Sequence, residues 1–567
     1  MIIAFLISFG VFLFTSCPTV YSGDSGELTT ACSVLGIAHP PGYPLYVLLG
    51  KIFTLIIPFG NIAYRINLMS AFFGAMTCGL VYLAVKRISG LADKESPNLA
   101  NLPAYLLTCL SALTLAFSNP LWSQSTMAEV YSLNGFFVAL IIYLLLLPTF
   151  HFLLPAFLFG LGLGNHHTLV LLIPGIVYLL MVTGRRKTVD GKPLFSTLLP
   201  STLYLLPVFL LGFSVYLFMI VRSQQNPIAD WDNPENITNF LKVVFRTGYG
   251  GIMHLEEKGG FLTRPMNLFV QQMSEFAGNL IKSFTIFGFI VGIFGIFLNY
   301  KQNKKSFWFL FLIFIFIGPF FIFLANKPVE NYTRDLLEPF YIPSIIVFAI
   351  WISFGIIFLI KKNKLNYVLI IGILIFQFKT NFAENNLRNN FIAFDFGKNI
   401  LKTVQNNSLL FLDKSDESVF ILAYQKIVEK RKPSVEIFDC NASVFPNIYG
   451  DRYYWIKGRQ RTAVRLPIER KIIWESKKNV YYLAENPNYF SDMKFFKTGL
   501  LYLLNKKLPA VVFGDFYVLR KINLRYRDKI IAYSFYVSVG NYYLGTNQPV
   551  LASAMYEKAN KISAELR

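Results

Sequence analysis

Charged residues are scarce in this sequence. They make up 15% of its 567 residues, whereas an ordinary soluble domain has roughly 25%. Cysteine is scarce too: there are five, and none forms a CxxC pair, so neither a disulfide framework nor a zinc site has support. No Walker A loop is present, which leaves direct use of ATP unsupported. These shortages exclude a disulfide scaffold and a typical soluble enzyme.

Apolar residues take the place of the missing charge. They make up 54% of the chain, phenylalanine alone supplies 57 residues, and the mean hydropathy is +0.47. This composition indicates a polytopic membrane protein with a soluble part. About 20 apolar residues cross a bilayer as a helix, and eleven segments are candidate spans. They are 2–18, 66–85, 101–117, 128–148, 152–164, 168–183, 199–221, 277–299, 307–325, 341–360 and 366–378.

Two apolar segments near the N-terminus need a separate interpretation. No basic residue precedes the run 2–18, so we expect a first membrane helix rather than a cleaved signal peptide. The run 43–58 is also apolar, but it contains Lys51 and is bounded by prolines. We therefore expect it to lie on the membrane surface as an interfacial helix.

Basic residues gather in alternate short loops between the predicted spans. Such loops face the cytoplasm under the positive-inside rule. We therefore expect an integral protein of the inner or cytoplasmic membrane, if bacterial, with its N-terminus in the cytoplasm and everything after about residue 378 outside. The basic residues are Lys86, Arg87, Lys94, Arg185, Arg186, Lys187, Lys192, Lys301, Lys304, Lys305, Lys361, Lys362 and Lys364.

The net charge of +21 follows from this topology and does not indicate nucleic acid. Besides the cytoplasmic loops, residues 381–567 hold 29 Lys and Arg against 17 Asp and Glu. A basic outer domain suits anionic lipid headgroups. Membrane lipids are therefore expected partners, and nucleic acid is not.

The tail after the last span has the pattern of a soluble α/β domain. Segments 408–413 and 509–514 are typical of short buried strands, and helical stretches such as 417–430 alternate with them. The last segment resembles one tetratricopeptide-like (TPR-like) helical hairpin, which must pack on a neighbour. The predicted organisation is a transmembrane module 1–221 with its first outer loop 19–65, a long outer loop 222–276, further transmembrane helices 277–378, an α/β domain 379–529 and a helical hairpin 530–567.

The first outer loop carries two carboxylates, Asp24 and Glu27, directly after the first predicted span. If a helix begins near Ser25, the two residues form a capping motif. Alternatively, ionised groups at the mouth of a membrane bundle mark a functional site, where one of them would be a general base. The residues alone leave both interpretations open.

Further candidates lie at the predicted outer ends of spans. Glu129 is an ionisable group at such an end, which favours function over structure. Arg222 and Arg246 are outer-face cations, for which snorkelling to lipid headgroups is the ordinary interpretation. The adjacent pair His166 and His167 lacks a third ligand at a spacing that demands metal. We therefore predict no metal site, and a role in binding by hydrogen bonds competes with a plain turn.

The first loop resembles the signature of a family of membrane glycosyltransferases with the GT-C architecture. Eukaryotic members of that family are protein O-mannosyltransferases that modify IPT-type domains of plexins and receptor kinases. The resemblance is carried by Asp24-Ser25-Gly26-Glu27-Leu28 and by the stretch LGIAHPPGYPLY over 35–46. Segments 65–68, 119–122, 128–134, 164–168 and 222–234 are similar to further family segments.

The resemblance implies a GT-C bundle of about eleven transmembrane helices and a transferase reaction. A mannose-like sugar would pass with inversion from a polyprenyl-phosphate carrier to an acceptor hydroxyl, on protein Ser or Thr or on a glycan. Asp24 would be the base, with Glu27 the second catalytic candidate. Neither a tightly bound cofactor nor a divalent metal is expected. The residues implied in binding sugar or lipid phosphate are His39, Tyr43, Glu129, Tyr131, His166, His167, Arg222 and Arg246.

Two other functions compete with a transferase. A transporter or flippase of a lipid-linked or anionic solute would favour inverted repeats and charges within the spans. No clear repeat is present, and the acidic residues lie at the ends of the predicted spans. A non-catalytic membrane scaffold is the second rival, and the presence of both Asp24 and Glu27 argues against it.

Overall fold

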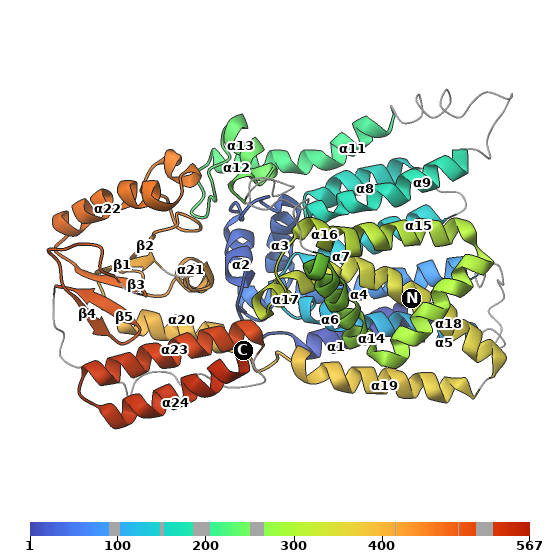
Figure 1. Ribbon diagram of the computed structural model, residues 1–567. Helices are drawn as coiled ribbons and strands as arrows, with labels where there is room; N and C mark the ends of the chain where they lie inside the picture. Colours follow the sequence, from blue (N-terminus) through green and yellow to red (C-terminus); the bar gives the residue numbers. More distant parts are fainter. Residues whose placement is uncertain are drawn as a thin grey trace. The chain divides into compact units, whose positions relative to one another are not determined.

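The computed structural model (Figure 1) divides the chain into two compact units. We call Met1–Ser16, Asn67–Leu217 and Met253–Leu387 the helical unit, and Cys17–Ile66, Phe218–Ile252 and Arg388–Arg567 the mixed unit. The first outer loop thus folds with the C-terminal domain, although in sequence it joins two predicted spans. The structure describes residues 1–89, 102–147, 152–184, 204–249, 266–363, 365–413, 416–485, 487–505 and 525–566.

Six helical stretches in the described part of the chain are long and apolar enough to cross a membrane. They are Ile62–Ile88 (α4), Leu205–Ser223 (α11 Leu205–Phe213 to α12 Leu217–Ser223), Met266–Gln302 (α14), Lys304–Ala325 (α15 Lys304–Ile315 to α16 Phe321–Ala325), Asn331–Lys362 (α17 Asn331–Leu337 to α18 Ile342–Lys362) and Asn366–Asn385 (α19).

The other predicted spans coincide with shorter helices in the described part of the chain. These are α1 (Ile2–Thr15), α5 (Leu102–Ala116), α7 (Tyr131–Leu146), α8 (Leu153–Leu163) and α9 (Ile173–Gly184). A polytopic membrane protein is therefore what the helices support, while the count of eleven spans stays a prediction. The basic residues expected at 94, 185–187, 192 and 364 lie outside the described residues.

Helix α14 is broken within the apolar bundle. Thr285 has φ 63° and ψ 167°, which interrupts the helical hydrogen bonds. The freed carbonyl oxygen of Ser283 accepts hydrogen bonds from Gln377 Nε2 (2.8 Å) and Asn381 Nδ2 (3.3 Å), both on α19. An unsatisfied backbone group in lipid costs several kcal/mol, so these two amides stabilise the break.

The mixed unit contains a five-stranded sheet in the order β2-β1-β3-β5-β4. Strand β1 (Ser408–Asp413), predicted at 408–413, pairs in parallel with β2 (Glu436–Asp439) and β3 (Asn479–Ala484). Strand β5 (Leu501–Leu504) runs antiparallel to both β3 and β4 (Phe495–Thr498). The predicted helix 417–430 is α21 (Asp416–Ala423) with a π-turn to Val428. The strand expected at 509–514 lies outside the described residues.

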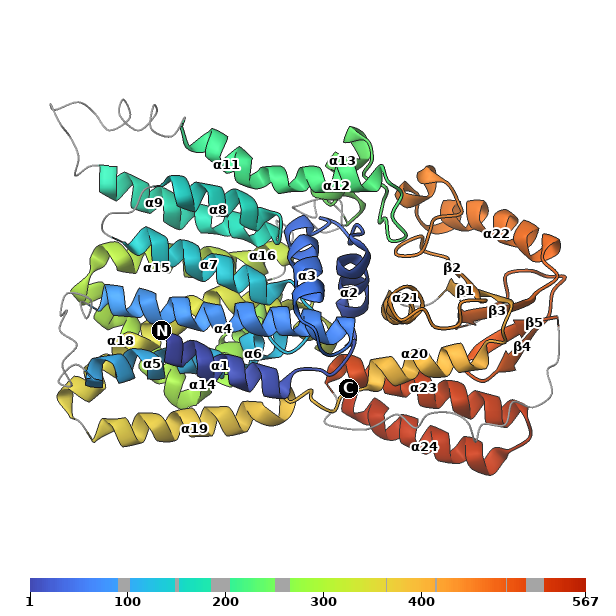
Figure 2. The same ribbon diagram turned by 180° about the vertical axis from the view of Figure 1, so that it is seen from behind.

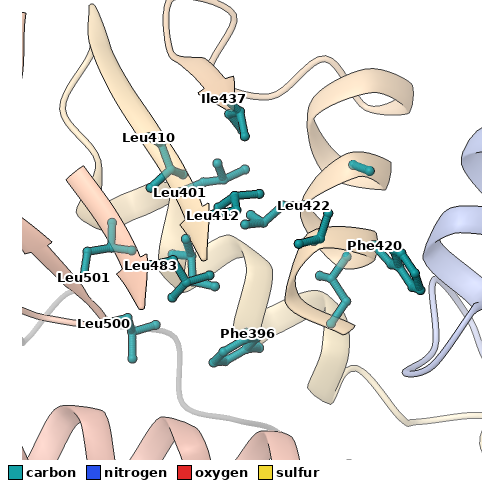
Figure 3. Close-up of a cluster of buried hydrophobic side chains, with 14 of the residues drawn as sticks. Phe396, Leu401, Leu410, Leu412, Phe420, Leu422, Ile437, Leu483, Leu500 and Leu501 are labelled. Atoms are coloured by element: carbon teal, nitrogen blue, oxygen red, sulfur yellow. The ribbon is translucent and has the colours of Figure 1, made fainter. Parts of the chain in front are cut away.

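Residues alternate along β1 between two hydrophobic clusters, one on each face of the sheet. Leu410 and Leu412 pack with residues of α20 (Ile392–Thr403) and α21, as Figure 3 shows. Leu409 and Phe411 pack on the other face, where α22 (Gly458–Glu475) adds partly buried side chains. Figures 1 and 2 show α22 on one face of the sheet, with α20 and α23 on the other. The unit is therefore a three-layer α/β sandwich.

The chain's last described segment is a helical hairpin, α23 (Tyr526–Gly545) followed by α24 (Pro549–Leu566). Ile531, Phe535 and Val539 of α23 are buried in the same cluster as Leu410 and Leu412. The hairpin therefore packs on the α/β sandwich. This packing buries the apolar face of the hairpin, which a lone repeat could not bury by itself. Its likeness to a TPR repeat stays a prediction.

Two short helices of the first outer loop complete the mixed unit, α2 (Ser25–Val34) and α3 (Pro44–Ile56). A Cβ at Gly26 would lie 2.4 Å from the carbonyl oxygen of Phe420, so α2 meets α21 at backbone distance. Helix α3 leaves Leu55 and Ile56 exposed, which suits the surface helix expected over 43–58. The placement of α3 on a membrane stays a prediction.

Candidate functional site

Asp24 occupies the position before α2, but it does not cap that helix with its side chain. Its backbone already has helical angles (φ −75°, ψ −5°), and its carboxylate makes no capping hydrogen bond. The side chain is 39% exposed. The capping interpretation of Asp24 is therefore wrong: the backbone has turned into the helix one residue too early for the carboxylate to reach the free N–H groups.

Glu27 points from the first turn of α2 toward His39, twelve residues further along the chain. Its Oε1 accepts the backbone N–H of His39 at 2.8 Å, and its Oε2 lies 3.0 Å from His39 Nδ1. The other ring nitrogen, Nε2, lies 3.9 Å from Asp24 Oδ2. The imidazole thus bridges a buried carboxylate, 2% exposed, and a partly exposed one.

The two carboxylates set the charge of His39. Burial alone would lower the pKa of the imidazole, but the negative charge of Glu27, the hydrogen bond to it and the charge of Asp24 together raise the pKa to about 9. At neutral pH the ring is therefore an imidazolium, which donates its Nδ1–H to Glu27 and directs its Nε2–H toward Asp24.

Aromatic rings hold the imidazole from two sides. Tyr43 packs edge-on with its ring centroid 4.9 Å from that of His39, and Trp231 does so at 5.8 Å. Tyr43 has a left-handed backbone (φ 44°) next to Gly42 (φ 89°), a turn that brings the tyrosine ring back onto the histidine. Tyr43 is only 5% exposed, so its contacts position His39 and leave little ring surface for a sugar.

The segment after residue 222 is joined to the first loop through the backbone. The Ile37 N–H donates to the Ala229 carbonyl at 2.8 Å, and the Trp231 N–H donates to the Ile37 carbonyl at 3.4 Å. The residue that follows this bridge, Asp232, is buried, and burial raises its pKa to about 7. The positive charge of His39 acts in the opposite direction and lowers the pKa of Asp232. The sequence did not single out Asp232 as a site residue, although its Trp-Asp-Asn-Pro context lay within the resemblance.

Arg222 lies at the C-terminal end of α2. Its Nε donates to the Leu35 carbonyl at 2.6 Å and its Nη2 to the Val34 carbonyl at 3.1 Å. These carbonyls have no partner within the helix, and the helix dipole makes that end negative. The contacts thus give Arg222 a capping position, and its role in phosphate binding stays a prediction. Arg246 is half-buried, and its positive charge acts on the pKa of His39.

The remaining predicted residues lie in the helical unit. His166 Nδ1 accepts the Thr168 backbone N–H at 3.3 Å and lies 2.7 Å from the Thr168 hydroxyl oxygen. Tyr131 packs against this ring at 5.3 Å between centroids, so the structure brings these two residues together. His167 instead lies with Nε2 2.8 Å from the Tyr216 hydroxyl. Glu129 is buried, with 6% exposure.

Asp416 is a second site candidate that sequence reasoning missed. It begins α21 just beyond the carboxyl end of β1, and burial together with the charges of Asp439 and Asp24 raises its pKa. Its place beyond the end of a parallel strand was the available signal, because ligands of α/β sheets bind there. Among the described residues, no group of three His, Cys, Asp or Glu side chains is arranged to hold a metal ion.

Comparison with known proteins gives matches to sequence relatives. Residues 24–190 match a family model for the protein O-mannosyl-transferase TMEM260 N-terminal domain. Protein O-mannosyl-transferase tmem260 of Dictyostelium discoideum is 28% identical over 493 residues, which cover 75% of this chain and 56% of that protein. Protein O-mannosyl-transferase TMEM260 of Mus musculus is 28% identical over 466 residues, with 76% and 61% covered. The chain thus spans less than two thirds of each relative's length.

A solved structure adds the fold. The crystal structure of ArnT from Cupriavidus metallidurans in the apo state aligns with a TM-score of 0.54 over 89% of this chain and 97% of that one. At 9% sequence identity, this likeness shows the fold alone. Together these matches confirm the resemblance carried by the first loop: the chain is a membrane protein of GT-C fold, similar to the TMEM260-type, O-mannosyltransferase-like family.

Proposed function

We propose that the protein is a membrane glycosyltransferase that uses Asp24 as its general base. It would move a mannose-like sugar from a polyprenyl-phosphate carrier to an acceptor hydroxyl, on a protein serine or threonine or on a glycan. The observation that carries the proposal is the difference in exposure between the two carboxylates that flank His39. The names of the similar proteins from Dictyostelium and mouse support the reaction class.

The exposure of the two carboxylates selects the base. Glu27 is 2% exposed and both of its oxygens contact His39, so no acceptor can reach it without displacing the histidine. Asp24 is 39% exposed, and its one contact with His39, at 3.9 Å, is longer than a hydrogen bond. An acceptor hydroxyl can therefore approach Asp24 alone.

The reaction would proceed in one displacement. The acceptor O–H gives its proton to Asp24 as the oxygen forms a bond to the anomeric carbon, and the bond from that carbon to the carrier phosphate breaks with its electron pair on the phosphate. Attack from the side opposite the phosphate inverts the anomeric centre. The imidazolium of His39 would orient Asp24 and offset negative charge that develops nearby. No step in this scheme uses a metal or a bound cofactor.

The location of the reaction is part of the same proposal. With the N-terminus in the cytoplasm, the first outer loop and the α/β sandwich lie outside the cell membrane. Both belong to the mixed unit. This supports a position on the same side of the membrane, because one compact unit cannot be divided by a bilayer. The acceptor would then be a secreted or surface-exposed molecule, and membrane lipids would surround the helical unit.

Transfer by purified protein tests the proposal. Full-length protein in lipid nanodiscs is mixed with polyprenyl-phosphate mannose and a Ser/Thr-rich acceptor peptide, and the glycosylated product is measured by mass spectrometry. We expect Asp24→Asn to lose about 100-fold or more of the rate. Asp492→Asn is the matched control, because Asp492 is 43% exposed and pairs with Arg470 on the α/β sandwich.

Two results would contradict the proposal. Full activity in Asp24→Asn would remove Asp24 as the base. Passage of a labelled lipid-linked sugar across a proteoliposome membrane, without any glycosylated product, would favour the transporter.

A further inference from the structure

The turn that presents Asp24 is contacted by the first turn of the C-terminal helix α23. Asp528 there is completely buried, and its Oδ2 accepts hydrogen bonds from Tyr21 Oη at 3.2 Å and from Asn390 Nδ2 at 2.7 Å. Tyr21 precedes Asp24 by three residues and is 3% exposed. A buried carboxylate more than 500 residues away in sequence thus fixes the start of the turn.

Two arginines beside Asp528 contact the same turn. The guanidinium of Arg525 lies 5.9 Å from the centre of the Tyr21 ring. The guanidinium of Arg527 lies against Gly23, where its Nη1 would be 1.8 Å from a Cβ added at that position. Gly23 also has φ 72°, a conformation that glycine adopts without strain. Positions 21 and 23 are therefore both held by α23.

The other side of the turn is tied to helix α2. The Tyr21 backbone N–H donates to Ser25 Oγ at 3.2 Å, and the Leu28 N–H donates to the Asp24 carbonyl at 2.8 Å. Asp24 thus follows a short segment whose two ends are fixed to different elements. A displacement of α23 would move this segment, and Asp24 with it, relative to His39.

We propose that Arg525, Arg527 and Asp528 are positioning residues for Asp24, so that the C-terminal hairpin is part of the catalytic apparatus. This inference rests on the proposed function. The three side chains need not touch substrate: they act by fixing where the Asp24 carboxylate lies when the acceptor arrives. General-base catalysis depends on that placement, since a misplacement of about 1 Å costs about 100-fold in rate.

The test uses full-length protein in nanodiscs with four variants of one small region. Asp528→Ala removes the acceptor of both hydrogen bonds, whereas Asp528→Asn keeps an oxygen that can accept them. Tyr21→Phe removes one donor and keeps the ring. Lys529→Ala is the matched control, because Lys529 is the next residue of α23 and pairs with Glu565 on α24 at 3.2 Å. For each variant, kcat and the KM for polyprenyl-phosphate mannose are measured with amide hydrogen exchange of peptides covering 20–28 and strand β1.

We expect Asp528→Ala to lower kcat by about 10-fold or more while the donor KM changes by less than about 2-fold. Exchange should quicken over 20–28 and stay unchanged in β1. Asp528→Asn should recover most of kcat, Tyr21→Phe should show a smaller loss of the same kind, and Lys529→Ala should match the wild type.

Three outcomes would overturn the inference. The first is wild-type exchange over 20–28 in both Asp528→Ala and Tyr21→Phe. The second is an equal acceleration in β1, which would assign Asp528 to global stability. The third is a loss in Asp528→Ala that appears in KM instead of kcat. If the wild type transfers no sugar at all, the proposed function fails, and the exchange data alone still decide whether α23 holds the turn.

Discussion

Replacing Glu27 with glutamine isolates the charge that keeps His39 protonated. The side chain keeps its size and one oxygen that can accept a hydrogen bond, but it loses the negative charge 3.0 Å from Nδ1. Glu27 is the largest of the influences that raise the pKa of His39. Because burial, which lowers that pKa, is unchanged by the substitution, we expect the pKa of His39 to fall well below its wild-type value of about 9.

The raised pKa also makes stability depend on pH. Folding raises the pKa of His39 from its ordinary 6.5 to about 9, so the folded state binds the proton more tightly than the unfolded chain. At about 1.4 kcal/mol per pKa unit, this difference stabilises the folded state by about 3 kcal/mol. The contribution is fully present below pH 6.5 and is lost as the pH rises through 9.

Two measurements check this reasoning. Nuclear magnetic resonance of protein labelled at histidine Cε1 follows the titration of each of the five histidines, and His39→Gln assigns the resonance of interest. Thermal unfolding between pH 6 and pH 10 should show a decline above pH 7 in the wild type that is weaker in Glu27→Gln. A His39 resonance that titrates near 6.5 in the wild type, or that titrates equally in both proteins, would refute the assignment.

Three further substitutions test the contacts that position the site. Gly26→Ala should lower the unfolding free energy by about 1–3 kcal/mol, because its Cβ would lie 2.4 Å from the Phe420 carbonyl oxygen, whereas Gly545→Ala has open space and should not. Gln377→Leu should lower it by about 1–3 kcal/mol in denaturant titrations, since the carbonyl freed at the α14 kink loses a donor. Arg222→Ala should lower the melting temperature and leave the donor KM near the wild-type value; an unchanged melting temperature with a raised KM would indicate phosphate binding instead.

The predicted site on the first outer loop rests on a local pattern in the sequence. Asp24 and Glu27 follow an apolar run, and His39 follows in a rigid, proline-rich segment. The residues themselves did not distinguish the two carboxylates, and only the resemblance favoured Asp24 as the base, because their difference in exposure depends on which carboxylate the histidine covers. The contact between Glu27 and His39 joins residues that are twelve positions apart, on either side of a change in chain direction. Spacing along the chain cannot reveal it.

Long-range contacts account for the other features of the site that the sequence did not predict. Arg222 donates to carbonyls almost 190 residues earlier in the chain, a contact that the sequence did not indicate, and its role in phosphate binding stays a prediction. Asp232 and Asp416 were not predicted as site residues, because each is brought near His39 by a contact between distant parts of the chain. For Asp232 this is the backbone bridge, and for Asp416 it is the edge of the sheet. In contrast, β1 was predictable at 408–413, since a strand buried on both faces is a continuous apolar run.

Under the proposed function, the mixed unit, rather than the membrane spans, creates the unequal environments that distinguish Asp24 from Glu27. Two chemically similar groups can take different roles only if their surroundings separate them. Here α21 meets α2 at backbone distance, the Ile37–Asp230 bridge brings Trp231 to His39, and α23 fixes Tyr21. Each contact joins the first loop to a segment that follows it by 190 residues or more. Loss of the C-terminal hairpin should therefore impair transfer even though every predicted catalytic residue remains present.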